Sequence, residues 1–254
     1  MKFTLDEKKL VEDIRGLLRI DSTTGVREKE YPLGKGVNDA IDYVIAKGKE
    51  FGFTGENLDG YCGYVEMGKG EKMIGILAHV DTVPVDDNWT HPAFDCTEEN
   101  GYLYGRGIVD DKGPAMIALH AMKALADSGI ELDKRIRLII GGDEEGGEWL
   151  CMKHYKEKAE MPTCAFSPDA SYPATYAEKG ILRIDITGKL PEGTPPLTLS
   201  LIHILPPEKS HPGDLGIRRH RRPRKGRLQR GGPGQQVPCR YPGGGRHRPR
   251  GALF

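Results

Sequence analysis

Residues 73–81 read Met-Ile-Gly-Ile-Leu-Ala-His-Val-Asp. The nearly unbroken apolar run before His79 is typical of a strand that is covered on both faces. His79 stands at the carboxyl end of this run, and Asp81 follows it. A second apolar run, residues 135–140, ends at Gly-Gly-Asp-Glu-Glu, and a third, residues 163–166, ends at Ser-Pro-Asp. Because ligands of open α/β sheets bind beyond the carboxyl ends of the strands, these polar residues are predicted to share one rim.

Helical patterns alternate with these strands. Apolar residues recur at helical spacing after a Thr4–Glu7 capping box, and similar patterns follow it along the chain. The predicted helices cover residues 4–18, 37–48, 114–125 and 147–158, and further strands cover residues 61–66 and 181–187. Asn100-Gly101 predicts a hairpin turn. The alternation predicts an α/β fold with a three-layer sandwich.

The length of 254 residues suits one large domain or two small ones. The five cysteines form no CxxC pair, and an odd number does not suit a closed disulfide framework, so we expect a reducing compartment. The sequence shows no apolar segment with the length of a signal-peptide core or a membrane span. We therefore expect a cytoplasmic protein without membrane contact.

The net charge of zero hides two different regions. Residues 199–254 carry 13 Lys and Arg against two acidic residues, which leaves 24 basic and 35 acidic residues in 1–198. Eight prolines, ten glycines and little apolar periodicity predict that residues 199–254 are disordered. Residues 199–204 also resemble the translation of a transposon end used in sequencing-library preparation. This likeness predicts that residues 199–254 are foreign to the natural protein.

His79 and Asp81 have the residue types and the spacing of a metal ligand with a carboxylate that orients it. Taken alone, a single histidine is more often a hydrogen-bonded surface or core residue. The later acidic motifs favour the metal site, because they also follow predicted strands.

Asp110-Asp111 and Glu144-Glu145 are pairs of neighbouring acids, and each could be a solvated turn. As parts of a site, one carboxylate of the first pair could bridge two cations. In the second pair, one glutamate could bind metal while the other accepts a proton from water. Asp169 follows Pro168 and is a candidate terminal ligand.

In this order, His79-Val80-Asp81, Gly105-Arg106-Gly107 with Asp110-Asp111-Lys112-Gly113, Asp143-Glu144-Glu145 and Ser167-Pro168-Asp169 resemble the motifs of the M20 family of dinuclear zinc peptidases. Glu178-Lys179-Gly180 is most similar to the bacterial dipeptidase branch, the PepV-like or Sapep-like enzymes. The resemblance covers about residues 5–197. It implies an incomplete zinc-peptidase-like catalytic domain in residues 1–180 and the start of an inserted lid domain in residues 181–198.

The resemblance also implies roles for single residues. His79 and Asp169 would be terminal ligands on different zinc ions, Asp110 would bridge both ions, and Glu145 would be a further ligand, with Mn²⁺ or Co²⁺ as alternative metals. Asp81 would orient His79, and Glu144 would be the general base that activates water. The Asp110–Asp111 peptide bond would be cis.

The substrate implied is a small peptide, and the reaction is hydrolysis of a dipeptide. The sequence does not resemble the family beyond about residue 197, where the family has a final histidine ligand, so we expect weak metal binding and little activity. A deacylase or succinyl-diaminopimelate desuccinylase with the same metal chemistry is the alternative. A nucleic-acid-binding role for residues 218–250 is a remote one, because only Tyr241 interrupts the arginines, and we expect no nucleic-acid partner. The oligomeric state is left open.

Overall fold

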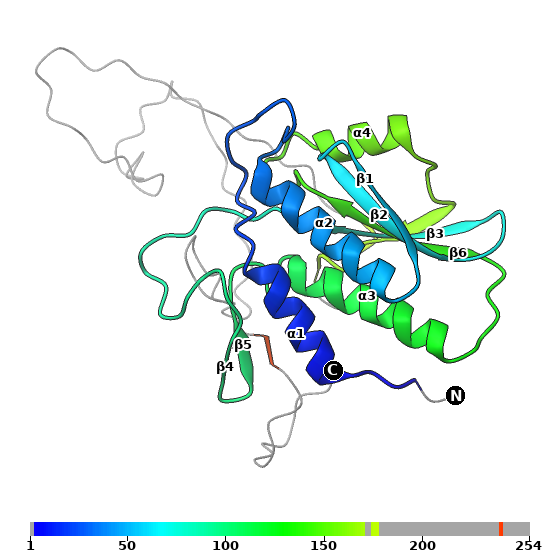
Figure 1. Ribbon diagram of the computed structural model, residues 1–254, viewed down its shortest axis with the longest axis horizontal. Helices are drawn as coiled ribbons and strands as arrows, with labels where there is room; N and C mark the ends of the chain where they lie inside the picture. Colours follow the sequence, from blue (N-terminus) through cyan, green and yellow to red (C-terminus); the bar gives the residue numbers. More distant parts are fainter. Residues whose placement is uncertain (1–2, 171–173, 178–238, 241–254) are drawn as a thin grey trace, which may run out of the picture. The chain divides into compact units, whose positions relative to one another are not determined.

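The computed structural model describes residues 3–170, 174–177 and 239–240 of the chain. Its helices are α1 (Glu7–Leu18), α2 (Lys35–Glu50), α3 (Lys112–Asp127) and α4 (Leu150–Lys158), shown in Figure 1. Its strands are β1 (Thr54–Leu58), β2 (Cys62–Gly68), β3 (Met73–His79), β4 (Thr97–Glu99), β5 (Tyr102–Tyr104), β6 (Arg135–Gly141), β7 (Cys164–Phe166) and β8 (Cys239–Arg240). Helices alternate with the strands of the larger sheet, so the predicted α/β fold is confirmed.

The larger sheet contains β1, β2, β6, β3 and β7 in this order. β3 is parallel to both β6 and β7, whereas β2 is antiparallel to β6 and to β1. The register pairs His79 with Gly141, the last residues of β3 and β6. The loops that follow these parallel strands therefore leave the sheet at the same edge, as the apolar runs predict.

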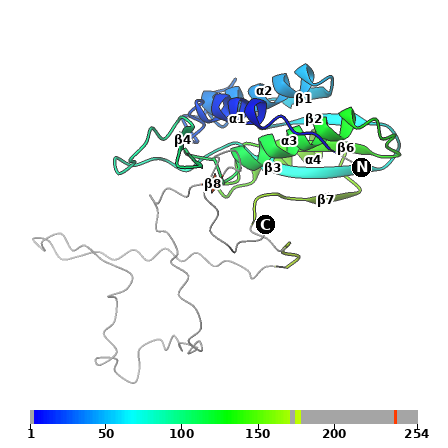
Figure 2. The ribbon, with the colours of Figure 1, turned by 90° about the horizontal axis from the view of Figure 1, so that it is seen from below.

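The two faces of this sheet carry separate apolar clusters, because side chains alternate along each strand. Leu138 and Ile140 of β6 pack in one cluster with residues of α1, α2 and α3, among them the fully buried Leu119. Ile139 lies between them in sequence and belongs to a second cluster with Tyr155 of α4. Helices thus cover both faces, which confirms the three-layer sandwich. Figure 2 shows α1 and α2 along one side of the sheet.

Two helices begin later than predicted. The Thr4–Glu7 capping box is wrong: Asp6 is the N-cap of α1, and its carboxylate accepts a hydrogen bond from the backbone N–H of Lys9 at 3.0 Å. The carboxylate thus accepts a hydrogen bond from one of the backbone N–H groups of the first turn that have no partner within the helix. Helix α4 begins at Leu150 rather than at residue 147, since Trp149 before it has a φ of 56°.

The strand β1 has no counterpart in the sequence prediction. Its residues Thr-Gly-Glu-Asn-Leu are mostly polar, and it lies at the outer edge of the sheet, paired only with β2 within the described residues. The hairpin at Asn100-Gly101 is confirmed between β4 and β5. Both turn residues have positive φ, 53° and 78°, as a tight two-residue hairpin turn requires.

The chain divides into two units, residues 1–175 with 231–254 and residues 176–230. Only residues 176–177 of the second unit are described. The predicted strand 181–187, the start of a lid domain and most of the predicted basic tail lie outside the described residues, so these boundaries stay predictions. Within the tail the structure describes β8, which pairs antiparallel with β5. None of the helices in the described ranges has the length and apolar character that crossing a bilayer requires.

Candidate metal centre

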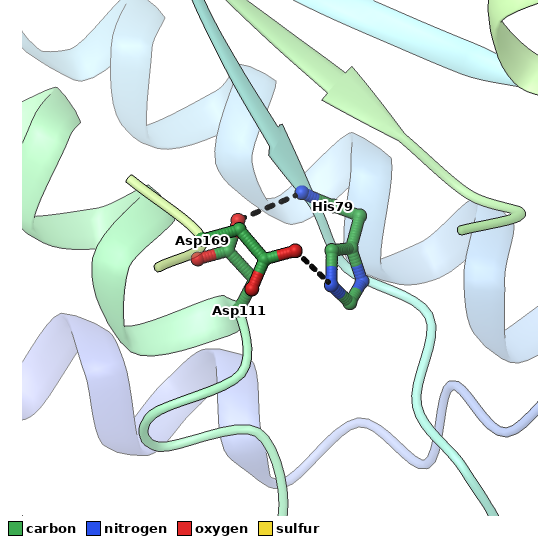
Figure 3. Close-up of side chains that lie close together, drawn as sticks. All are labelled: His79, Asp111 and Asp169. Atoms are coloured by element: carbon green, nitrogen blue, oxygen red, sulfur yellow. Dashed lines mark hydrogen bonds and ion pairs between the residues drawn. The ribbon is translucent and has the colours of Figure 1, made fainter. Parts of the chain in front are cut away.

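Three segments distant in the sequence bring acidic side chains to His79 at the edge of the sheet. His79 is the last residue of β3, and Asp110 and Asp111 directly precede α3. Glu144 follows β6, and Asp169 follows β7. Figure 3 shows Asp111 and Asp169 beside the imidazole of His79, each from its own loop. The fold thus assembles at one place residues that are up to 90 positions apart in the sequence.

The imidazole of His79 is 3% exposed and faces three carboxylates with one nitrogen. Its Nε2 lies 3.0 Å from Oδ1 of Asp110, 3.5 Å from Oδ2 of Asp169 and 3.9 Å from Oε2 of Glu144. Nδ1 lies 3.1 Å from the backbone carbonyl oxygen of Asp81 and donates its proton there. This hydrogen bond leaves Nε2 as the nitrogen that can bind a cation.

Asp81 connects His79 to the loop after β6. Its fully buried carboxylate places Oδ1 at 3.3 Å from Nδ1 of His79. The same carboxylate accepts the backbone N–H groups of Glu144 at 3.2 Å and of Glu145 at 3.0 Å. Asp81 therefore contacts both the imidazole and the backbone of the two glutamates, and so connects the end of β3 with the loop after β6.

Asp111 is a site residue to which the sequence prediction gave no role. It is fully buried, and its Oδ2 accepts the backbone N–H of His79 at 3.1 Å. Its Oδ1 is buried without a hydrogen-bond partner among the described residues. The peptide bond between Asp110 and Asp111 is cis, as the resemblance implied. The adjacent acids, flanked by apolar residues and glycine, were the signal, but the sequence does not say which carboxylate turns inward.

The ligand atoms of His79, Asp111 and Asp169 lie within 4.8 Å of one another. Asp110 and Glu145, two of the predicted ligands, are not part of this compact group. Asp110 contacts only one side of it, through Nε2 of His79. The structure therefore brings four of the predicted residues directly to the imidazole, adds Asp111, and places Glu145 next to them through its backbone contact with Asp81.

The pKa shifts of the site follow from burial and from the crowding of charge. Burial alone disfavours the imidazolium of His79, but hydrogen bonds with Asp110, Asp169 and Asp81 outweigh it and raise the pKa of His79. The hydrogen bond from His79 lowers the pKa of Asp110. Burial raises the pKa of Asp111 to about 8.

The two glutamates of the loop after β6 are shifted in the same direction. Burial raises the pKa of Glu144, and the negative charges of Asp169, Asp81 and Asp110 add to this effect. Burial and the charge of Asp110 raise the pKa of Glu145 to about 7. These carboxyl groups repel one another, and a cation between them would remove the repulsion.

The donor set fits a divalent cation. Imidazole nitrogen and carboxylate oxygen are ligands that zinc takes in proteins. The unpartnered Oδ1 of the buried Asp111 is a further reason, because a buried carboxylate oxygen without a hydrogen bond is costly unless another group binds it. Zn²⁺, Mn²⁺ and Co²⁺ would all accept these donors.

A cavity of about 90 Å³ lies next to the site, lined by His79, Glu144, Asp169 and the apolar side chains of Trp149 and Met152. A larger cavity, about 380 Å³, lies between the start of α1 and the end of α3, against Lys9, Phe51 and His120. None of the residues that line the larger cavity belongs to the acidic site. The small cavity is therefore the one relevant to the chemistry.

Comparison with known proteins identifies the family of the chain. Residues 75–211 match the profile of peptidase family M20/M25/M40. The chain is 46% identical over 177 residues to "Putative dipeptidase YtjP" of Bacillus subtilis, a match that covers 68% of this chain and 38% of that protein. The chain thus spans about two-fifths of the length of this curated relative.

Solved structures of the same kind align with the described fold. A metallo-carboxypeptidase of the M20 family from Sulfolobus solfataricus, Sso-CP2, aligns with a TM-score of 0.52 and 26% identity, over 66% of this chain and 38% of that one. Human carnosine dipeptidase 1 aligns with a TM-score of 0.52 and 20% identity, over 60% of this chain and 35% of that one, and supports the fold. With a profile match over more than half of its length, this chain belongs to peptidase family M20/M25/M40.

Proposed function

We propose that this chain carries part of the catalytic domain of a metal-dependent dipeptidase, which hydrolyses the peptide bond of small peptides. The observation that carries the proposal is the arrangement at the edge of the sheet, where one imidazole nitrogen faces Asp110, Asp169 and Glu144 within 3.9 Å. The names of the curated relatives supply the substrate class, because YtjP is described as a dipeptidase.

We assign metal binding to His79, Asp110, Glu145 and Asp169, with two zinc ions as the resident metal. Bound divalent ions polarise a peptide carbonyl and lower the pKa of water. The short contact between His79 and Asp110, 3.0 Å, supports a shared ion at this point. Asp111 lies close enough to His79 to be a further ligand.

Glu144 is proposed to accept the proton of the attacking water and to pass it to the leaving amine. Its side chain is 36% exposed and its carboxylate lies 3.9 Å from Nε2 of His79, so it reaches the site and stays open to substrate. Burial and neighbouring charges raise its pKa, which makes it a stronger base than an ordinary glutamate. Asp81 orients His79 and touches no substrate.

The small cavity beside His79 has room for only a part of a small peptide, such as its scissile amide. Its volume of about 90 Å³ equals roughly three water molecules. Trp149 and Met152 make part of its wall apolar. We also place the protein in a reducing cytoplasm, because Cys62, Cys96, Cys151 and Cys164 are free and the first three of them are buried.

For the chain by itself we propose weak metal binding and little hydrolysis. The match covers only 38% of the curated relative YtjP, and among the described residues His79 is the only histidine in the acidic cluster. The part of the relatives that this chain does not match has room for further ligands and for groups that hold substrate.

Zinc titration of the purified chain tests this proposal. We expect zinc to bind, and Asp110→Ala to weaken it strongly, because the short contact with His79 is lost. Glu144→Ala should retain most zinc binding and remove any residual hydrolysis of a panel of dipeptides and N-acyl amino acids. Glu148→Ala is the control, since Glu148 lies in the same loop and pairs with Arg27 at the surface.

Equal zinc affinity in the wild type and Asp110→Ala would contradict the ligand assignment. Cleavage of N-acyl amino acids without cleavage of dipeptides would replace the dipeptidase by a deacylase. Robust dipeptide hydrolysis by the chain alone would contradict the proposed dependence on further residues.

A further inference from the structure

The end of α1 leads into residues 17–23, which we call the α1 junction and which contain both exposed and buried side chains. Within it, Ser22 is fully buried. Its hydroxyl donates to the carbonyl oxygen of Val80 at 2.5 Å, and its own carbonyl oxygen accepts the N–H of Thr82 at 3.2 Å. Thr23 also forms a parallel bridge with Thr82. The α1 junction therefore forms hydrogen bonds with Val80 and Thr82, the residues directly before and after Asp81.

Lys112 ties the α1 junction to the second loop of the site. It directly follows Asp110 and Asp111 and is fully buried. Its Nζ donates to the carbonyl oxygens of Leu17 at 3.3 Å and of Ile20 at 2.7 Å. The carbonyl oxygen of Leu17 also accepts the N–H of Ile20 at 3.3 Å, so Lys112 adds to a turn that already closes the end of α1.

The two loops come from different parts of the chain, and both contact the α1 junction. One loop follows β3 and the other precedes α3. A lysine near a helix end often caps carbonyl groups for stability alone. Here the lysine is covalently next to Asp111, whose carboxylate accepts the N–H of His79. A displacement of Lys112 would therefore move a carboxylate of the site.

We propose that Ser22 and Lys112 are positioning residues, which act through the α1 junction to set the separation between His79 and Asp110–Asp111. The effect on metal affinity rests on the proposed metal-dependent function, whereas the positioning of the two loops can be tested on the metal-free protein. The side chains of Ser22 and Lys112 form hydrogen bonds with backbone carbonyl oxygens and not with the carboxylates around His79. Partners that orient ligands typically change metal affinity about 10- to 100-fold when they are replaced.

Two variants test the inference, and each removes only the side-chain hydrogen bonds of the replaced residue. Lys112→Met keeps an unbranched side chain and loses both donors, and Ser22→Ala loses only the hydroxyl. Tyr155→Phe is the matched control. It removes a buried hydroxyl that accepts from Arg137 at 3.0 Å and donates to Glu160 at 2.9 Å, on the opposite face of the sheet.

The first measurement needs no metal. Amide hydrogen exchange of His79 reports its hydrogen bond to Asp111, because the His79 N–H donates to that carboxylate rather than to a neighbouring strand. We expect exchange at His79 to accelerate on the order of tenfold in Lys112→Met and Ser22→Ala, the size of one lost hydrogen bond. Tyr155→Phe should leave it unchanged, even at an equal loss of thermal stability.

The second measurement is zinc affinity by competition with a chromogenic chelator. Lys112→Met and Ser22→Ala should bind zinc roughly 10- to 100-fold more weakly, and Tyr155→Phe should bind as the wild type does. If Lys112→Met does not fold, Ser22→Ala decides.

Unchanged exchange at His79 together with unchanged zinc affinity in a folded variant overturns the inference. An equal effect in Tyr155→Phe also overturns it, because the effect would then follow from general destabilisation. A wild type that binds no zinc removes the proposed function, whereas the exchange experiment still decides whether Ser22 and Lys112 position the loops.

Discussion

Replacement of Asp111 by asparagine is expected to stabilise the metal-free protein at neutral pH. Burial raises the pKa of Asp111 to about 8, although nearby His79 lowers it, and the charges of Asp169 and Asp110 add to the rise. In the unfolded chain the same carboxyl has a pKa of about 3.9. At pH 7 folding therefore takes up a proton, which costs about 4 kcal/mol.

An amide at this position avoids that cost. Its oxygen can still accept the N–H of His79, which lies 3.1 Å from the carboxylate of Asp111. Its NH₂ group is left buried without a partner, which costs about 1–3 kcal/mol. We expect a net gain of about 1–3 kcal/mol at pH 7, or a rise in Tm of roughly 2 to 12 °C.

The sign of the pH dependence follows from the raised pKa. The folded state binds more protons than the unfolded state between about pH 4 and pH 8, so the wild type loses stability as the pH rises through this window. Asp111→Asn should lack this slope. Its advantage should vanish between about pH 4.5 and pH 6, where the cost of the proton falls to the 1–3 kcal/mol of the unpartnered NH₂ group, and the wild type should be the more stable protein below that range. Urea unfolding in EDTA across this window measures both quantities.

The control is Asp87→Asn, which changes an exposed aspartate in the loop after β3. It should keep the slope of the wild type. Excess zinc should reverse the order, because a ligand at 100 times its Kd adds about 2.7 kcal/mol to a protein that binds it. An Asp111→Asn variant that is less stable than the wild type in EDTA at pH 7 would refute the reasoning.

Three further predictions concern single contacts. Asp6→Ala should lower the free energy of unfolding by about 1 kcal/mol through loss of the N-cap, whereas Thr4→Ala should not change it, as urea unfolding will measure. Burial raises the pKa of Asp13, but the hydrogen bond from Lys9 and other nearby cations outweigh burial and lower it. The stabilisation by Asp13 is therefore present above about pH 4 and lost below it. Asp13→Asn should make the free energy of unfolding depend less on pH in the acid range, as urea unfolding will measure. Asp81→Asn should weaken zinc binding roughly 10- to 100-fold in a chelator competition, because it misorients the imidazole.

The apolar runs were sufficient to predict the centre of the fold. Residues of β3 and β6 are buried by helices on both faces, so the sequence must be apolar almost throughout, whereas a strand with one face in water would alternate with polar residues. β3 ends at His79, and β6 is followed, after Gly142, by acidic residues at the same edge of the sheet, which is why His79 and Glu144 could be placed together from the sequence alone.

The strand β1 could not be predicted in this way. Its residues alternate between exposed and half-buried, with Leu58 as the single buried side chain. Gly55 and Asn57 have low strand propensity. Pairing with β2 and packing against α2 stabilise this strand, and neither contact can be recognised from a local pattern in its sequence.

Asp111 shows a second limit of the same kind. The sequence places two acids side by side, and the resemblance gives the metal to Asp110. Which carboxylate turns inward depends on the backbone N–H of His79, a group 32 residues away in the sequence. A tertiary contact therefore decides which carboxylate is buried, and the spacing of residues within the Asp-Asp motif does not predict it.

The contacts of the site divide its function into two parts that depend on different residues. The acids are held by backbone N–H groups of the described fold: those of Glu144 and Glu145 bind Asp81, and that of His79 binds Asp111. These donors are fixed by β3 and β6, whose packing lies within the described residues. The positions of these acids are therefore a property of this part of the fold, whereas the proposed binding of a peptide needs walls that a cavity of about 90 Å³ supplies only in part. It follows that zinc binding and hydrolysis should separate in this chain, with variants of Asp81 or Asp111 changing the first even where the second is too slow to measure.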